Sequence, residues 1–217
     1  MPPRELEYVF VVTYGRSGST LLMGLLNSLP GYLIRGENWS ALHHLFQFDQ
    51  TMRTHSARAP KRRLRRPTHP FYGIGGYPQA KAVRQIRRLA TDTVLRPEED
   101  TRVTGFKEIR WDQPDVADYV AWMREVFPGA RFVVNTRNLD DVRQSKWWAE
   151  NEEKAAQLDD IERGILSLAE SLGDAAYRVH YDDYVADPTV LRGLFTWLGE
   201  EFDEERVRAT MAVRHSY

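Results

Sequence analysis

The segment from residue 8 to residue 22 brings together the groups that bind a phosphate-like anion. Residues 8–12 (YVFVV) are apolar, aromatic and β-branched, which predicts a strand covered on both faces. The turn that follows contains two glycines, one arginine and three hydroxyl residues: Gly15, Arg16, Ser17, Gly18, Ser19 and Thr20. A helix is expected to begin at Ser19 or Thr20, with its free N–H groups and its positive dipole end facing the turn. Amides, hydroxyls and a guanidinium together predict an anion site.

This turn differs from the loop that binds nucleoside triphosphates. That loop follows the pattern G-x-x-x-x-G-K-[ST], whereas here Ser19 stands where the Lys would be and the turn is shorter. A kinase or NTPase function is therefore disfavoured. An ordinary strand-to-helix turn without a ligand stays open as the alternative.

Residues 16–22 (RSGSTLL) resemble the 5′-phosphosulfate loop of the sulfotransferases that use 3′-phosphoadenosine-5′-phosphosulfate (PAPS). In that family a basic residue precedes S-G-[ST]-T. The resemblance implies that the loop binds the 5′-phosphosulfate through six residues: Arg16, Ser17, Gly18, Ser19, Thr20 and Leu21. It also implies that Arg16 takes part in the transfer itself.

A second stretch resembles the 3′-phosphate motif of the same family. Residues 130–136 (ARFVVNT) predict a strand, Arg137 leaves it, and Ser145 lies two turns along the helix expected next. Arg137 has a planar, permanently charged side chain that suits bidentate contact with phosphate. The resemblance implies that Arg137 and Ser145 bind the 3′-phosphate of PAPS and of its product, 3′,5′-adenosine bisphosphate (PAP).

Two further charged residues are expected at the carboxyl ends of parallel strands, the edge where ligands bind in such sheets. Glu37 follows a predicted strand over residues 32–35, and Lys107 lies near the end of a later strand. The resemblance implies that Glu37 is the general base and that Lys107 approaches the transferring group or the acceptor. A glutamate that merely complements a helix dipole is the alternative for Glu37. His43 and His44 are rival bases.

Trp147 and Trp148 follow the second motif directly. An aromatic face could stack on the adenine of the donor. Packing against a neighbouring helix is the alternative, and we expect it for at least one of the two.

Composition limits the remaining possibilities. With 217 residues, 42% hydrophobic residues and a net charge of −1, the chain is expected to form one globular α/β domain over residues 1–217. It contains no Cys, which excludes disulfides, thiolate nucleophiles and cysteine metal sites. No signal peptide, membrane-spanning run or cluster with metal-ligand spacing stands out, so we expect a cytoplasmic enzyme without a metal.

Residues 51–78 lose hydrophobic periodicity, are rich in Arg and end in a passage rich in Pro and Gly. This pattern predicts a basic mobile loop or lid. Such a run could grip nucleic acid or a sulfated glycan, but solvated surface is the favoured interpretation, and no nucleic-acid partner is expected. The next segment, residues 79–95, predicts a helix whose inner stripe is Ala82, Ile86 and Leu89.

The order of the elements defines the expected fold. Strands are predicted over residues 8–12, 32–35, 102–111, 130–136 and 176–181, and helices over residues 21–29, 41–48, 79–95, 115–127, 151–172 and 189–198. This alternation predicts a three-layer α/β domain with a mostly parallel central sheet flanked by helices. The resemblance implies the P-loop-NTPase-like sulfotransferase fold.

The sequence thus favours a PAPS-dependent sulfotransferase that acts on a hydroxyl or amine of a small-molecule or glycan acceptor. Two alternatives stay open. One is a kinase-like phosphotransferase that uses ATP and Mg²⁺. The other is a non-catalytic module that binds nucleotides or polyanions through the basic segment.

Overall fold

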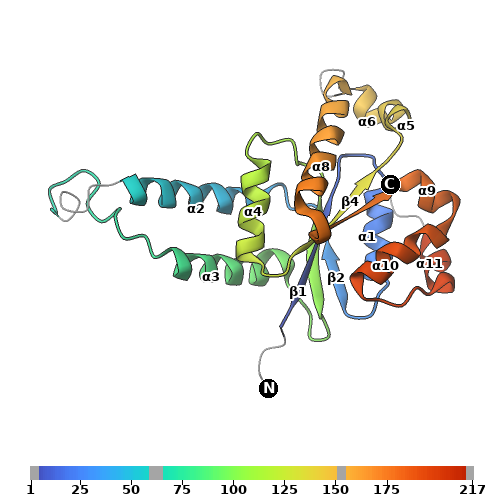
Figure 1. Cartoon of the computed structure of the whole chain (residues 1–217), viewed down its shortest axis with the longest axis horizontal. Helices are drawn as coiled ribbons and strands as arrows, with labels where there is room; N and C mark the ends of the chain where they lie inside the picture. Colours follow the sequence, from blue (N-terminus) through green and yellow to red (C-terminus); the bar gives the residue numbers. More distant parts are fainter. Residues whose placement is uncertain (1–4, 59–65, 151–154, 214–217) are drawn as a thin grey trace.

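The computed structural model describes residues 5–58, 66–150 and 155–213 (Figure 1). Within these residues five strands form one sheet: β1 (Glu7–Val12), β2 (Tyr32–Arg35), β3 (Val103–Glu108), β4 (Arg131–Thr136) and β5 (Ala176–His180). Their order is β2-β3-β1-β4-β5, and each neighbouring pair is parallel. The predicted strands are therefore confirmed, and the strand that precedes the glycine turn is the central one.

Helices cover both faces of the sheet, which confirms the three-layer α/β architecture. One face packs against α2 (Ala41–Arg58), α3 (Gln79–Ala90), α4 (Val116–Val126) and α8 (Leu158–Leu172). The opposite face packs against α1 (Ser19–Asn27), α9 (Tyr181–Ala186), α10 (Arg192–Leu198) and α11 (Glu204–Met211). Alternate residues of β1 enter the two cores: Phe10 and Val12 lie in the first, and Val9 and Val11 in the second. This double burial explains why β1 is apolar throughout.

Shorter elements complete the described chain. They are α5 (Leu139–Gln144), α6 (Lys146–Ala149), the π-helical turn η2 (Thr91–Leu95) and the 3₁₀ turns η3 (Gly173–Ala175) and η4 (Pro188–Leu191). The helix predicted over residues 189–198 is thus divided between η4 and α10. The helix predicted over residues 151–172 is described from residue 155, and residues 151–154 lie outside the described residues.

The basic segment differs from its prediction. Residues 51–58 continue α2, so this part of the predicted loop is helical, and residues 66–78 form turns. Residues 59–65 lie outside the described residues. Helices α2 and α3 project together from one side of the sheet (Figure 1). The predicted stripe on α3 was partly wrong, because Val83, Ile86 and Ala90 are buried whereas Leu89 is 47% exposed.

None of the helices in the described part of the chain is both long enough and apolar enough to cross a membrane.

Candidate functional site

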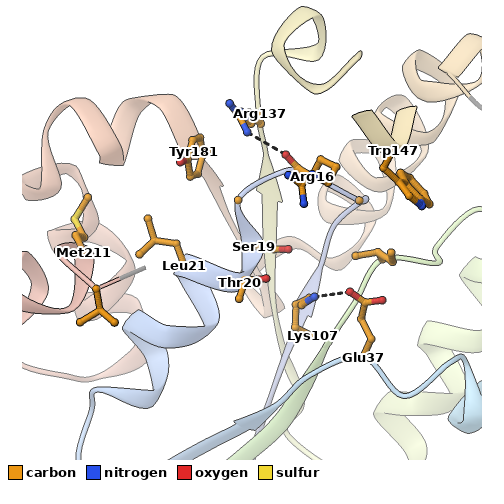
Figure 2. A pocket seen from close by; sticks show the side chains of 14 residues that line it. Arg16, Ser19, Thr20, Leu21, Glu37, Lys107, Arg137, Trp147, Tyr181 and Met211 are labelled. Atoms are coloured by element: carbon orange, nitrogen blue, oxygen red, sulfur yellow. Dashed lines mark hydrogen bonds and ion pairs between the residues drawn. The ribbon is translucent and has the colours of Figure 1, made fainter. Parts of the chain in front are cut away.

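A cavity of about 440 Å³ opens at the carboxyl edge of the sheet (Figure 2). Each of the five strands contributes to it: Arg16 follows β1, Glu37 follows β2, Lys107 lies in β3, Arg137 follows β4 and Tyr181 follows β5. Because parallel strands all end at one edge, residues far apart in sequence meet there. Eight of the predicted site residues line this cavity: Arg16, Gly18, Ser19, Thr20, Leu21, Glu37, Lys107 and Arg137.

The turn between β1 and α1 has a conformation that only glycine can adopt without strain at its key position. Gly18 caps α1 with a φ of 77°. A Cβ atom on Gly18 would lie 2.0 Å from Cδ2 of Tyr181, so both the backbone angle and the neighbouring ring exclude a side chain. Arg16 also has a positive φ, 66°, which is uncommon for a residue other than glycine. The turn is therefore built to bring its backbone close to the cavity.

The first turn of α1 offers unsatisfied donors to the cavity. Leu21 donates its backbone N–H to the carbonyl oxygen of Gly18 at 2.9 Å, so this amide is already occupied and the side chain of Leu21 is what lines the cavity. No hydrogen bond within the described residues takes the backbone N–H of Ser19 or Thr20. Free amides at the positive end of a helix attract anions.

Ser17, one of the predicted donor-binding residues, is absent from the cavity lining. It is fully buried, and its hydroxyl is 2.6 Å from Oγ1 of Thr13. Its carbonyl oxygen accepts a hydrogen bond from Nδ2 of Asn135 at 2.9 Å. Ser17 therefore joins the turn to β4, and its side chain does not line the cavity, because these internal hydrogen bonds hold it in the core.

Arg137 is brought directly to the glycine turn. Its Nη1 donates to the backbone carbonyl oxygen of Arg16 at 3.2 Å, and its guanidinium carbon lies 4.6 Å from the centre of the Tyr181 ring. Nε of Arg137 is 3.9 Å from Oδ1 of Asp182 and forms no hydrogen bond within the described residues. The two motifs that were predicted to bind anions thus meet at one cavity.

The hydroxyl of Tyr14 holds the backbone of Arg137. This buried hydroxyl accepts the backbone N–H of Arg137 at 2.9 Å and donates to Oε1 of Glu162 at 2.7 Å. Burial, and then the hydrogen bond to Glu162, raise the pKa of Tyr14, so the hydroxyl keeps its proton. Helix α8, which carries Glu162, therefore fixes where Arg137 leaves β4.

Ser145 is not on a continuous helix. Helix α5 ends at Gln144, and Ser145 is extended with φ −66° and ψ 138°. Its hydroxyl donates to the carbonyl oxygen of Val142 at 2.7 Å, and Ser145 is absent from the cavity lining. The prediction that Ser145 lies two turns along a helix was wrong, since the chain breaks between α5 and α6.

Glu37 and Lys107 form an ion pair inside the cavity, with Oε1 of Glu37 2.6 Å from Nζ of Lys107 (Figure 2). The Lys107 side chain is only 7% exposed, whereas that of Glu37 is 31% exposed. Nη1 of Arg110 lies 3.6 Å from the other Glu37 oxygen, Oε2. The pairing orients the carboxylate, and its partial exposure leaves it accessible from the cavity.

The rival histidines are not in the cavity lining. His43 is buried, its Nε2 is 2.9 Å from Oδ1 of Asp115, and its ring packs edge-on against Tyr119 at 5.1 Å. His44 pairs with Gln47 on the surface of α2. Both have structural surroundings, so Glu37 is the predicted base that the fold brings to the cavity.

The two tryptophans have different positions. Trp148 is buried and donates from Nε1 to the carbonyl oxygen of Gly15 at 2.8 Å. It belongs to the core cluster that also holds residues of α4 and α8, so this ring packs inside the protein. Trp147 lines the cavity and is 46% exposed. A Cβ atom on Gly15 would lie 2.8 Å from Cζ3 of Trp147, so the glycine lets this ring pack against the turn.

Sequence reasoning missed several residues of this site. Tyr181, Ile109, Met211 and Val213 line the cavity without having been predicted. Tyr181 could have been found, because it directly follows β5 just as Arg137 follows β4. Met211 lies at the end of α11 and has no local signal, since its place in the cavity depends on the packing of α11 against α1.

The site combines positive charge, free amides and one accessible carboxylate. Arg16, Lys107 and Arg137 supply three cations at the cavity wall. Such a lining suits a ligand with more than one anionic group. Among residues 5–58, 66–150 and 155–213, no group of three His, Asp or Glu side chains could hold a metal ion.

Comparisons with known proteins agree with this arrangement. The model of the sulfotransferase family matches residues 8–204. The sequence matches no curated protein significantly. The fold is similar to the sulfotransferase domain of the Synechococcus PCC 7002 olefin synthase, with a TM-score of 0.62, 21% identity and coverage of 99% of this chain and 81% of that one. It is also similar to the sulfotransferase domain of the curacin biosynthetic pathway, with a TM-score of 0.53, 14% identity and coverage of 98% and 80%. These likenesses confirm the expected P-loop-like fold.

Proposed function

Because this chain belongs to the sulfotransferase family, we propose that it transfers the sulfuryl group of PAPS to a hydroxyl or amine of a small-molecule or glycan acceptor and releases PAP. One observation carries the proposal. Arg16 and Arg137, which come from the two motifs that resemble donor-binding motifs, line one cavity and are joined by a 3.2 Å hydrogen bond. A nucleotide with phosphate groups at the 3′ and 5′ positions of its ribose could contact Arg16 and Arg137 at the same time.

The residues present fit such a donor. The unsatisfied amides of Ser19 and Thr20, together with Arg16, would hold the 5′-phosphosulfate. Arg137 would hold the 3′-phosphate through its guanidinium, whose Nε has no hydrogen-bond partner within the described residues. The hydroxyl of Ser145 would have to leave the Val142 carbonyl to join it.

Glu37 and Lys107 would act on the transfer itself. Glu37 would accept the acceptor proton as the acceptor oxygen or nitrogen forms its bond to sulfur. The bond from sulfur to the bridging phosphate oxygen breaks, and its electron pair stays on that oxygen. Arg16 and Lys107 would stabilise the charge that develops there and on the sulfonyl oxygens. The 2.6 Å ion pair supports this pairing of roles, because it keeps the base and the cation side by side.

The two alternatives have less support. A kinase-like function lacks the lysine of the nucleoside-triphosphate loop. A polyanion-binding module that relied on the basic segment would not explain why Arg16, Lys107 and Arg137 gather at one cavity.

A stability assay with three nucleotides tests the donor. PAP at a hundredfold excess over its dissociation constant should raise the free energy of unfolding by about 2.7 kcal/mol. Adenosine 5′-monophosphate and ATP, which lack the 3′-phosphate, should stabilise less at equal concentration. Equal or greater stabilisation by ATP with Mg²⁺ would favour the kinase alternative. Sulfuryl transfer itself is measured in a separate assay with labelled PAPS and a panel of acceptors.

A further inference from the structure

Residues 36–40, which join β2 to α2 beside Glu37, have an unusual backbone. Trp39 and Ser40 have φ angles of 56° and 59°, in the region that normally suits glycine. Such angles are uncommon for any other residue, and a bulky one there marks strain. Strained backbone persists where the surrounding structure imposes it, and it is often found at binding sites.

A buried carboxylate imposes this conformation. Oε2 of Glu108 accepts the backbone N–H of Asn38 at 3.3 Å and that of Ser40 at 3.1 Å. Its other oxygen, Oε1, accepts a hydrogen bond from Nη1 of Arg110 at 3.0 Å. Glu108 is 4% exposed and lies at the end of β3, one residue after Lys107. The loop is therefore fixed to the same strand end that carries the ion pair of the cavity.

The loop that Glu108 holds in place carries a highly exposed aromatic side chain, that of Trp39. Trp39 is 79% exposed, the most exposed of the large hydrophobic residues that the structure describes. The guanidinium carbon of Arg110 lies 4.5 Å from the centre of its ring, and Nη1 of the same arginine is 3.6 Å from Oε2 of Glu37. Arg110 thus links the indole to the proposed base, while the large exposed fraction leaves much of the ring accessible.

We propose that Trp39, held by Arg110, is the acceptor platform of this enzyme, and that it binds a hydroxylated cyclic acceptor by stacking on its ring. An indole stacks on aromatic rings and packs against the C–H face of sugars, whereas an open-chain alcohol offers no flat face. Stacking here would keep a ring hydroxyl near the Glu37 carboxylate, because one arginine contacts both. The inference rests on the proposed transfer at Glu37.

Binding of three probes in the presence of PAP tests the platform. Phenol, methyl β-D-glucopyranoside and 1-hexanol are titrated by saturation-transfer NMR into the full chain and its variants. We expect wild-type protein to bind at least one of the two ring probes, Trp39→Gly to weaken that binding at least fivefold and Trp39→Phe to retain most of it. Phe71→Ala is the matched control, since Phe71 is 62% exposed but lies between α2 and α3, where its ring packs against His69 and not against Arg110. Neither Trp39 nor Phe71 lines the cavity itself.

The outcomes separate this inference from the proposed function. Trp39→Gly should bind PAP as wild type does and should unfold at the same or a higher temperature, because glycine tolerates the positive φ. The platform is overturned if neither ring probe binds wild-type protein with PAP present, if Trp39→Gly binds them equally, or if hexanol binding falls in parallel. Loss of PAP binding in wild-type protein would instead overturn the proposed function.

Discussion

Nη1 of Arg137 donates to the backbone carbonyl oxygen of Arg16 at 3.2 Å, across 121 positions of sequence. This contact joins the turn after β1 to the turn after β4, which are neighbouring strands of the sheet. It also means that the Arg137 side chain braces the glycine turn and lines the cavity at the same time. Changes at either turn should therefore affect the binding of one ligand.

Replacing Arg137 by Ala should weaken PAP binding about 10- to 150-fold, since hydrogen bonds to charged groups contribute about 1.5–3 kcal/mol. Adenosine 5′-monophosphate should lose much less, because it has no 3′-phosphate. Isothermal titration of both nucleotides measures the difference. Arg163→Ala, on the surface of α8, is the control and should change neither affinity. Equal losses for the two nucleotides would place Arg137 away from the 3′-phosphate.

Replacing Gly18 by Ala should destabilise the fold and disrupt the anion site. The positive φ alone should cost about 1–3 kcal/mol, and the added Cβ would also lie 2.0 Å from the Tyr181 ring. Urea denaturation measures the loss. The double variant Gly18→Ala/Tyr181→Ala should recover the steric part and not the backbone part, whereas Gly36→Ala, where nothing lies within 4 Å, is the mild control.

Replacing Tyr14 by Phe should act on PAP binding through Arg137. The variant leaves the backbone N–H of Arg137 and the carboxylate of Glu162 without the hydroxyl between them. A lost buried hydrogen bond costs about 1–3 kcal/mol of stability. A purely structural role would lower the affinities for PAP and adenosine 5′-monophosphate alike, whereas a positioning role should lower the affinity for PAP more. Titration of both nucleotides at a temperature well below the unfolding midpoint distinguishes the two.

Replacing Glu37 by Gln should lower kcat about 10²- to 10⁴-fold, the usual contribution of a general base. The amide keeps the shape of the side chain and an oxygen for Lys107, so PAP affinity should stay within about twofold. Single-turnover transfer from labelled PAPS gives the rate, and PAP titration gives the affinity. Turnover at a near-normal rate would rule out Glu37 as the base.

The sequence alone determined the five strands, most of the longer helices and most of the cavity wall. Local sequence patterns sufficed for this. A strand that is buried on both faces must be apolar, and a turn whose backbone approaches another group closely needs a glycine, as at Gly18. Parallel strands then place Arg16, Glu37, Lys107 and Arg137 at one edge without any knowledge of side-chain packing. The position of each of these residues at or near the end of a strand can be predicted from the sequence.

Tertiary packing decided which side chains reach the cavity and which are held back. Ser17 and Ser145 carry suitable hydroxyls, but the first is bound within the core to Thr13 and the second to the Val142 carbonyl. Met211 enters from α11. The backbone on both sides of Trp39 is held by hydrogen bonds from Asn38 and Ser40 to Glu108, a residue far away in sequence. These positions depend on contacts between segments that are far apart in the sequence, so no local pattern of residues encodes them. A hydroxyl or an indole can bind a protein group as well as a ligand, and only the tertiary structure decides which of the two it meets.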